Sequence, residues 1–449
     1  MEDRIRQAIS EKVADAVSGD FPETIRREAR LPAIPGKAHA VTGMRRAGKT
    51  CFLMQCLADA LVDGVERERL VYLNLEDDRL GELSGEELSA AVEAYYGLFP
   101  EFRRTREVWF CFDEIQLVPQ WERFVRRLLD TEKVRVLLSG SSAKMLSREV
   151  ATSMRGRALE TVMTPYGFRE FLSARRVGAG DVAAEAAAPS AKTRSLLQKG
   201  LSDYLEVGGF PEVVAASMAG AGAKTRIRLL QSYVDAVVFR DVAERHSVGN
   251  LTALRAFVRQ LMRMPASALS VNKISNDFRS RGIAASKETL LAFLDYLSDA
   301  FLVAAVPLFS SSERRRQVNP RKLYLADHSL AAAFSPADGL NRGRLLENVV
   351  AVELFRRMRD IGYYKTSSGL EVDFCVFDFS GSQHLIQVAA DVGDPKTWNR
   401  EVASLVEASG EQPEASLWLL CEDPSALGPV NTPVGVRVLP VWQWLAMRD

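Results

Sequence analysis

The stretch from Gly43 to Thr50 reads GMRRAGKT and decides the fold class, because it fits the P-loop pattern G-x-x-x-x-G-K-[ST]. Its glycines let the chain curl so that backbone N–H groups point at phosphate oxygens. The lysine supplies positive charge for the β- and γ-phosphates, and the threonine hydroxyl reaches Mg²⁺. The pattern therefore predicts a site for ATP and Mg²⁺, contacted by Gly43, Met44, Arg45, Arg46, Ala47, Gly48, Lys49, Thr50 and Cys51.

The residues on either side support this interpretation. Residues 37–42 (KAHAVT) are small or apolar, as in a buried strand, and residues 50–62 place apolar side chains at helical spacing. The helix would begin at the phosphates, where its dipole favours negative charge. Arg45 and Arg46 are open to two interpretations, since they could contact phosphate or a partner, or could be solvated loop charges.

A second apolar run, residues 108–112 (VWFCF), ends in Asp113 and Glu114. It has the pattern of a strand covered on both faces, and open α/β sheets bind ligands at the carboxyl ends of their strands. We expect Asp113 to hold Mg²⁺, together with Thr50, and Glu114 to deprotonate the attacking water. The alternative is a solvated acidic turn. The next strand, residues 134–138, is followed by SGSS, where Ser139 or Ser141 could touch the water or γ-phosphate. Ser141 is the predicted catalytic residue. The alternative is that these serines form a simple turn.

Bulk composition limits the function classes. The chain has 449 residues, which suggests two to four domains, and 58 basic against 58 acidic side chains. With no net charge, nucleic-acid binding would need a local patch. Five cysteines without a C-x-x-C pair indicate reduced thiols, and four scattered histidines give no sign of a zinc site. We expect a cytoplasmic protein without a signal peptide or membrane span.

The composition predicts an α/β protein in five segments. An N-terminal helix and lead-in should occupy residues 1–36, followed by a P-loop ATPase core with a parallel sheet in 37–172. Residues 173–249 should form a linker and helical lid, because an Ala/Gly-rich stretch precedes a helical block. A winged helix is expected in 250–330 and a further α/β domain in 340–449.

The winged-helix prediction rests on three helical patterns followed by two strand patterns around a polar loop, residues 310–320. The third helix would begin near Lys287, and the loop carries three consecutive arginines. The residues predicted to contact DNA phosphates are Lys287, Arg314, Arg315, Arg316, Arg321 and Lys322. The alternatives are a protein-docking module and a merely solvated basic run.

The last segment has carboxylates in a suggestive order: Glu347 on a helix, then Glu371 and Asp373 on a strand. This is the layout of restriction-endonuclease-like nucleases, in which acids hold a metal and a lysine assists the attacking water. Gln387 and Ala389 stand here at the final acid and lysine positions, and neither substitutes for them. We therefore expect an inherited scaffold that does not cut DNA, with the three acids left to hold any metal.

As an ordered set, the motifs resemble a large bacterial and archaeal group of AAA-superfamily ATPases. Members of that group carry a C-terminal domain of unknown function with a restriction-endonuclease-like fold. The matching segments are VTGMRRAGKT, VYLNLEDDRL, CFDEIQ, LLSGSSAKML, SMRGR, YLEVGGFPEVV, KLYLAD, LLENVVAVEL, GLEVDF and LIQV, from residue 41 to about 388. The resemblance implies an ATPase, in some proposals one that acts on DNA.

The family layout also gives Arg155 and Arg157 a role, because in a ring they could reach a neighbouring subunit's nucleotide and act as catalytic residues. The alternative is an intrachain salt bridge to Glu149 or Glu160. A homo-oligomer, possibly a ring, is thus expected. Three functions remain open: a DNA-binding ATPase that remodels or translocates DNA, a nucleotide switch acting on a protein partner in a signalling or defence complex, and an ATP-dependent nuclease, which Gln387 and Ala389 disfavour.

Overall fold

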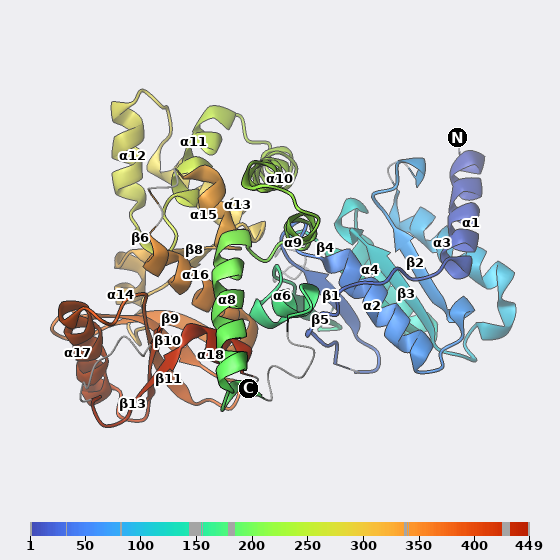
Figure 1. Ribbon diagram of the computed structural model, residues 1–449. Helices are drawn as coiled ribbons and strands as arrows, with labels where there is room; N and C mark the ends of the chain where they lie inside the picture. The colour runs from blue at the N-terminus through green and yellow to red at the C-terminus, as the bar shows by residue number, and fades with distance from the viewer. Residues whose placement is uncertain are drawn as a thin grey trace. The chain divides into compact units, whose positions relative to one another are not determined.

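The computed structural model describes residues 2–32, 34–80, 83–142, 154, 156–177, 185–335, 339, 341–423 and 432–447 (Figure 1). It divides into two compact units. Unit 1 comprises residues 1–163 with 299–301, and unit 2 comprises 164–298 with 302–449. The expected lid, winged helix and C-terminal domain fall within unit 2 except for residues 299–301, and the boundary expected at 172 lies beyond the start of that unit.

Unit 1 is built on a five-stranded parallel sheet in the order β2-β3-β4-β1-β5. The elements run α1 (Glu2–Ser18), β1 (Ala38–Thr42), α2 (Lys49–Val62), β2 (Leu70–Asn74), α3 (Gly85–Leu98), β3 (Val108–Asp113), α4 (Trp121–Thr131), β4 (Val134–Gly140) and β5 (Ala158–Val162). The first four strands are those predicted. Strand β5 was not expected, because its segment ALETV is only partly buried and lacks an apolar run.

Both faces of this sheet are covered, as the apolar strands require. Phe110 and Phe112 of β3 point into the core that α1, α3 and α4 cover, and their rings stack 5.9 Å apart. Cys111, between them, points into the opposite core with Phe52 and Leu57 of α2. Strand β4 lies between β1 and β3. The P-loop, which follows β1, and Asp113, at the end of β3, therefore lie on either side of the carboxyl end of β4.

Unit 2 begins with helices α6 (Phe168–Ala174), α8 (Ala191–Val207), α9 (Pro211–Met218) and α10 (Ala223–Ala236), which continues into a π-helical segment η6 (Val237–Glu244). The predicted break at GGFP is confirmed, since Gly208 caps α8 and Pro211 begins α9. Gly208 has φ 83° and approaches Ser329 so closely that a Cβ would lie 2.3 Å from its hydroxyl. Asp327 accepts the backbone N–H of Gly209 at 2.8 Å, so two of the motifs meet in one buried turn.

Residues 250–330 hold the elements expected there and two more, the strand β6 and the helix α14 (Glu313–Val318). Besides α14, these are α11 (Leu251–Met262), β6 (Ser267–Leu269), α12 (Val271–Ser280), α13 (Lys287–Asp299), β7 (Val303–Val306) and β8 (Arg321–Leu325), the strands forming an antiparallel sheet in the order β6-β8-β7. The side chain of Ser286 accepts from the N–H of Thr289 and caps α13, as predicted. The polar loop expected at 310–320 instead contains a short helix, α14 (Glu313–Val318), capped by Ser312.

The remaining chain forms a second five-stranded sheet in the order β13-β12-β11-β10-β9. Its elements are α15 (Ser329–Phe334), α16 (Arg342–Arg357), β9 (Asp360–Lys365), β10 (Glu371–Phe377), β11 (Gln383–Ala389), α17 (Pro395–Glu411), β12 (Ser416–Cys421), β13 (Val436–Pro440) and α18 (Val441–Ala446). Strands β9 to β11 are antiparallel and β11 to β13 parallel. The edge strand β9 also binds the segment after β7, because Phe309 donates to the Tyr363 carbonyl at 2.7 Å.

Candidate nucleotide site and the carboxylate cluster

The P-loop joins β1 to α2, and its backbone explains its glycines. Gly43 and Gly48 have φ 144° and 96°, values that side-chain-bearing residues rarely adopt. A Cβ on Gly43 would lie 2.1 Å from the Met163 carbonyl oxygen. Arg46 also has positive φ, at 66°. Only glycine at position 43 therefore allows the loop to pass so close to the residue that follows β5.

Lys49 and Thr50 begin helix α2, at the positive end of its dipole. The Lys49 ammonium is buried and donates to the carbonyls of Gly43 and Met44 at 3.0 and 3.2 Å, so the lysine is held within the curl of the loop. The exposed Thr50 hydroxyl donates to Asp113 Oδ2 at 2.7 Å. These oxygen ligands fit Mg²⁺, which binds carboxylate and hydroxyl groups in phosphate sites.

Asp113 is the centre of a wider network than the sequence predicted. Its Oδ2 also accepts from the Tyr72 hydroxyl at 2.7 Å, and its Oδ1 accepts from the Ser139 hydroxyl. The same Ser139 oxygen accepts the backbone N–H of Glu114 at 2.9 Å. Burial, followed by the charge of Asp113, raises the pKa of Tyr72, so its hydroxyl remains a donor. Four hydrogen bonds thus fix the two acids relative to the P-loop helix.

The structure assigns the contact at the tip of β4 to Ser139, which reaches Asp113 directly. Ser141, the predicted residue, lies two positions further along and is fully buried. Its catalytic role stays a prediction. Tyr72 was missed, because its contact with Asp113 depends on β2 lying next to β3. The only local signal was a hydroxyl group in the otherwise apolar strand LVYLN.

Glu114 occupies a strained position. Its backbone is left-handed, with φ 58°, which is uncommon for a residue with a side chain and is found often at functional sites. The Gln116 amide donates to its Oε2. The carboxylate is only partly buried, so solvent reaches the group that would activate water. This geometry suits the role of general base that the sequence predicts.

The remaining P-loop side chains differ in their exposure to solvent. Met44 and Ala47 are buried, whereas Arg46 and Cys51 are exposed, and Arg45 lies 3.6 Å from Glu76. A buried arginine that the sequence did not mark, Arg27, donates to the Ala47 carbonyl at 2.7 Å from behind the loop. No local pattern could have identified it, because Arg27 precedes the first strand in an irregular segment.

Of the two predicted trans-acting arginines, Arg155 lies outside the described residues. Arg157 forms an ion pair with Asp130 of α4, both side chains being more than a third exposed. The intrachain partner that the structure shows is thus Asp130 and not Glu160, and Glu149 lies outside the described residues. Glu160 instead accepts from Thr42 Oγ1 at 2.6 Å, and burial raises its pKa. An exposed pair of this kind costs little to break, so the role of Arg157 in trans stays a prediction.

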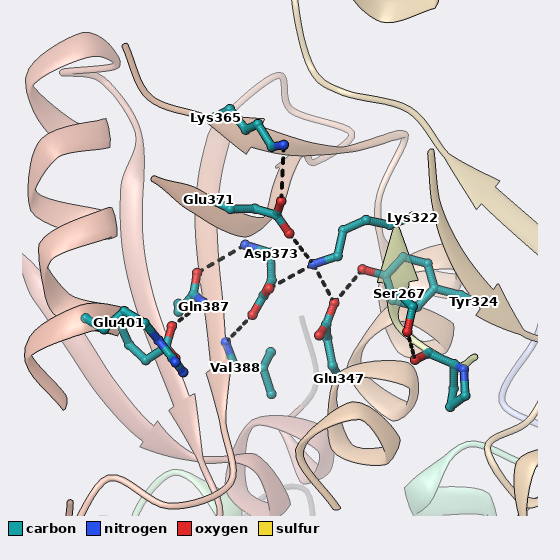
Figure 2. A network of polar contacts seen from close by, with 12 residues as sticks. Ser267, Lys322, Tyr324, Glu347, Lys365, Glu371, Asp373, Gln387, Val388 and Glu401 are labelled. Carbon is teal, nitrogen blue, oxygen red and sulfur yellow. Dashed lines mark hydrogen bonds and ion pairs between the residues drawn. The ribbon is translucent and has the colours of Figure 1, made fainter. Parts of the chain in front are cut away.

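The C-terminal acids form one cluster around a lysine from another element (Figure 2). The Lys322 ammonium of β8 lies 2.8 Å from Glu347, 3.1 Å from Glu371 and 2.9 Å from Asp373. Burial alone would lower the pKa of Lys322, but the three carboxylates raise it above its usual range. Within the described chain no group of three or more His, Cys, Asp or Glu side chains is arranged to hold a metal. The expectation that these acids are left to hold a metal is wrong, because the ammonium fills their centre.

This arrangement also corrects one predicted DNA contact. Lys322 is only 4% exposed, so it cannot reach a phosphate, whereas Arg314, Arg315, Arg316, Arg321 and Lys287 are exposed. The sequence could not distinguish Lys322 from its neighbour Arg321, because alternation along a strand places one side chain outward and the next inward. Which of the two side chains faces inward depends on the three carboxylates around Lys322, which come from α16 and β10.

Neighbours complete the cluster. Tyr324 donates to Glu347 at 2.7 Å, and Asp373 accepts the N–H of Val388 at 3.0 Å. Gln387, at the expected acid position, accepts the N–H of Asp373 through its side chain at 3.1 Å and donates to Glu401 at 2.5 Å. Burial, followed by the charge of Asp373, raises the pKa of Glu347 to about 8. Figure 2 shows the charged side chains of the cluster directed at other protein groups.

Unit 1 thus has the fold and site of a P-loop ATPase of the AAA type: a parallel sheet, a phosphate-binding loop and an Asp-Glu pair at the strand ends. A family model described as an AAA domain matches residues 35–172, and a model described as a domain of unknown function, DUF8612, matches residues 198–341. The chain is accordingly an ATP hydrolase by family and by site.

Two relatives extend this result over most of the chain. Uncharacterized protein MJ1544 of Methanocaldococcus jannaschii is 31% identical over 389 residues, or 86% of this chain and 82% of the relative. An uncharacterized protein of Haemophilus influenzae is 29% identical over 335 residues, or 74% and 78%. The chain belongs to the family of AAA-domain ATPases that includes MJ1544. Among solved structures it resembles the Walker-type ATPase PABY2304 of Pyrococcus abyssi, with TM-score 0.42 and 14% identity over 73% of this chain and 95% of that one.

Within the described part of the chain, no helix is long and apolar enough to cross a membrane.

Proposed function

We propose that this chain is a Mg²⁺-dependent, oligomeric ATPase that binds DNA through residues 250–330 and uses hydrolysis to remodel or translocate it. The ATPase part of this proposal rests on the hydrogen bond from the Thr50 hydroxyl to Asp113 at 2.7 Å, with Glu114 as the next residue. In this proposal Thr50 and Asp113 hold Mg²⁺, which would neutralise phosphate charge. Lys49 and the loop N–H groups bind the phosphates, and Glu114 takes a proton from water.

The DNA half rests on local charge. Arg314, Arg315 and Arg316 are exposed on α14, and Arg321 is exposed at the start of β8. Among the described residues no carboxylate forms an ion pair with Arg314 or Arg321, whereas Arg316 pairs with Glu313 at 3.7 Å. A short helix with three exposed guanidinium groups suits phosphate contacts that carry no sequence preference. Assembly of several copies, for example in a ring, would multiply such patches.

Replacing Arg314, Arg315 and Arg316 by alanine tests the DNA half. Binding to linear and branched duplexes should weaken, and the slope of log K against log salt should fall by roughly 0.9 for each phosphate that is no longer neutralised. Basal ATPase should not change. A matched control replaces three exposed arginines of unit 1, Arg104, Arg123 and Arg127, and should bind DNA as the parent does.

A second candidate is a nucleotide switch that acts on a protein partner. Two observations favour it: Lys322 is buried, and Phe309 is hydrogen-bonded to β9. In both cases residues of the predicted wing contact the C-terminal part of the chain. The two candidates differ in one measurement, steady-state ATPase with and without DNA. A motor should be stimulated by DNA, whereas a switch should turn over slowly and ignore it. Wild-type DNA binding by the triple arginine variant would leave the switch as the better proposal.

A further inference from the structure

The P-loop accepts a hydrogen bond from a residue outside the loop and its helix. Arg27, in the irregular segment between α1 and β1, donates from its guanidinium to the Ala47 carbonyl at 2.7 Å. Arg27 is only 3% exposed and Ala47 is fully buried, whereas Gly48, the next residue, is partly exposed. The bond from Arg27 therefore reaches the loop from the interior of unit 1.

The Ala47 carbonyl belongs to the same peptide group as the Gly48 N–H. This peptide group is trans, since the described residues include no cis peptide bond, so its C=O and N–H point in opposite directions. A carbonyl held toward the interior by Arg27 directs the Gly48 N–H outward, to the side where backbone N–H groups of a P-loop bind phosphate. Arg27 thus sets the direction of a donor that it does not contact.

The orientation of this peptide group needs support, because glycine leaves it free to rotate. Gly48 has φ 96°, and the absence of a side chain makes such rotation sterically cheap. The adjacent peptide groups have hydrogen bonds of their own: the Ala47 N–H donates to the Met44 carbonyl at 3.2 Å, and the Gly48 carbonyl accepts from Phe52 at 3.0 Å. The bond from Arg27 fixes the peptide group between them.

Arg27 is itself held against α2. Its backbone N–H donates to Gln55 Oε1 at 2.7 Å, and its carbonyl accepts from Gln55 Nε2 at 3.2 Å. Gln55 is a buried residue of α2, the helix that the P-loop begins. The backbone of Arg27 is thus fixed to the helix and its side chain to the loop. Because the guanidinium is charged, its bond to the Ala47 carbonyl is stronger than one between neutral groups.

We propose that Arg27 is a positioning residue for phosphate binding, which holds the Gly48 N–H toward the phosphates through the Ala47 carbonyl. The inference rests on the nucleotide site proposed above and names a residue that prepares it. ATP and ADP both place phosphates in the loop, so Arg27 should affect the binding of either nucleotide. It should have little effect on the hydrolytic step, in which Glu114 acts.

The test compares two neighbouring arginines in the full chain. Arg27→Met removes the donor and should weaken the binding of ADP and of a fluorescent ATP analogue by about tenfold, while kcat at saturating ATP stays within about threefold of the parent. Arg26→Met should bind both nucleotides as the parent does, since Arg26 is exposed and pairs with Asp59. Arg27→Lys retains a charged donor and should recover part of the lost affinity.

Tripolyphosphate separates an effect on the phosphates from an effect on the rest of the nucleotide. Its inhibition constant is measured by displacement of the fluorescent ATP analogue. In Arg27→Met it should rise by about tenfold, the same factor as the dissociation constant of the analogue, because the probe carries only the phosphate part. A residue that merely stabilised the fold would lower the melting temperature of the free protein without this selective loss.

Parental nucleotide affinity in Arg27→Met, or an unchanged inhibition constant for tripolyphosphate, would overturn the inference. If circular dichroism shows that Arg27→Met does not fold, Gln55→Met decides, because it releases the backbone of Arg27 and leaves the guanidinium in place. Nucleotide binding about threefold weaker in Gln55→Met supports the inference, and parental binding overturns it.

Lys49→Ala distinguishes failure of this inference from failure of the proposed nucleotide site. Parental binding of nucleotide by Lys49→Ala would contradict the site itself. Loss of binding in Lys49→Ala together with parental binding in Arg27→Met would contradict only the role of Arg27.

Discussion

Ser139 Oγ links Asp113 and Glu114, the two carboxylates proposed for catalysis: it donates to Asp113 Oδ1 and accepts the backbone N–H of Glu114 at 2.9 Å. The tip of β4 therefore holds the end of β3, and both acids have a fixed position relative to the P-loop helix. This follows from strand order, since β4 lies between β1 and β3. The site is thus prepared by its protein contacts before any phosphate binds.

Replacing Glu114 by glutamine should lower ATP turnover by about two orders of magnitude or more while ATP binding persists, because the amide cannot accept the proton from water. Lys49→Ala should instead weaken nucleotide binding. Phosphate release and the anisotropy of a fluorescent ATP analogue measure the two effects. The control Glu86→Gln, exposed at the start of α3, should be silent in both assays. Wild-type turnover by Glu114→Gln would show that the base is assigned wrongly.

Replacing Ser139 by alanine should lower kcat about tenfold with little change in nucleotide affinity, because Asp113 and the Glu114 backbone lose a shared hydrogen-bond partner that positions them. Steady-state kinetics at varied Mg²⁺ should also show a higher Mg²⁺ requirement. Ser232→Ala, on the exposed face of α10, is the matched control. If Ser141→Ala impairs turnover and Ser139→Ala does not, the sequence-based choice was the correct one.

Replacing Lys322 by methionine should destabilise the protein by about 3–5 kcal/mol, since Glu371 and Asp373 lose their buried counter-charge and Glu347 loses a hydrogen-bond partner. Urea denaturation measures the change. Arg321→Met, one residue away and exposed, should have no effect beyond error.

Neither the parent nor the variant Asp373→Ala should cut supercoiled, linear or branched DNA with Mg²⁺ or Mn²⁺. Cleavage by the parent that Asp373→Ala abolishes would contradict this account of the cluster.

The pKa of Glu347 predicts a pH dependence of stability. Its ordinary value is 4.5 and its value in the folded protein about 8, so the folded state retains this proton over an interval where the unfolded state loses it. The contribution is complete below pH 4.5 and is lost as pH rises through about 8. Stability should therefore fall between about pH 5.5 and about pH 8.5. Glu347→Gln should reduce this fall by on the order of 1–3 kcal/mol.

Urea midpoints at the two pH values provide the measurement. Lys322, Tyr324 and Asp373 face Glu347, and the first two stay protonated across this interval because their pKa values are raised. The control Glu407→Gln should not change the difference, since hydrogen bonds from the side chains of Ser368 and Thr366 lower the pKa of Glu407 and it titrates below the interval. An equal fall in Glu347→Gln and the parent would show that another group titrates.

The sequence by itself determined the features that depend on neighbouring residues. The P-loop, the two strands ending at Thr42 and Asp113, the GGFP break and the cap at Ser286 all follow from local backbone requirements and short apolar runs. Such signals are complete within a few residues, because turn geometry and helix caps are satisfied locally. The ATPase class could therefore be predicted without any tertiary information.

Only the tertiary structure decided which distant side chains meet. Tyr72 and Ser139 join Asp113 because β2 and β4 flank β3, and strand order is not encoded in any one segment. Lys322 is buried and Arg321 exposed because three acids from α16 and β10 surround one face of β8. A buried charge is stable only beside its counter-charges. Here the counter-charges lie on α16 and β10, too far from β8 in the sequence for a local pattern to reveal them.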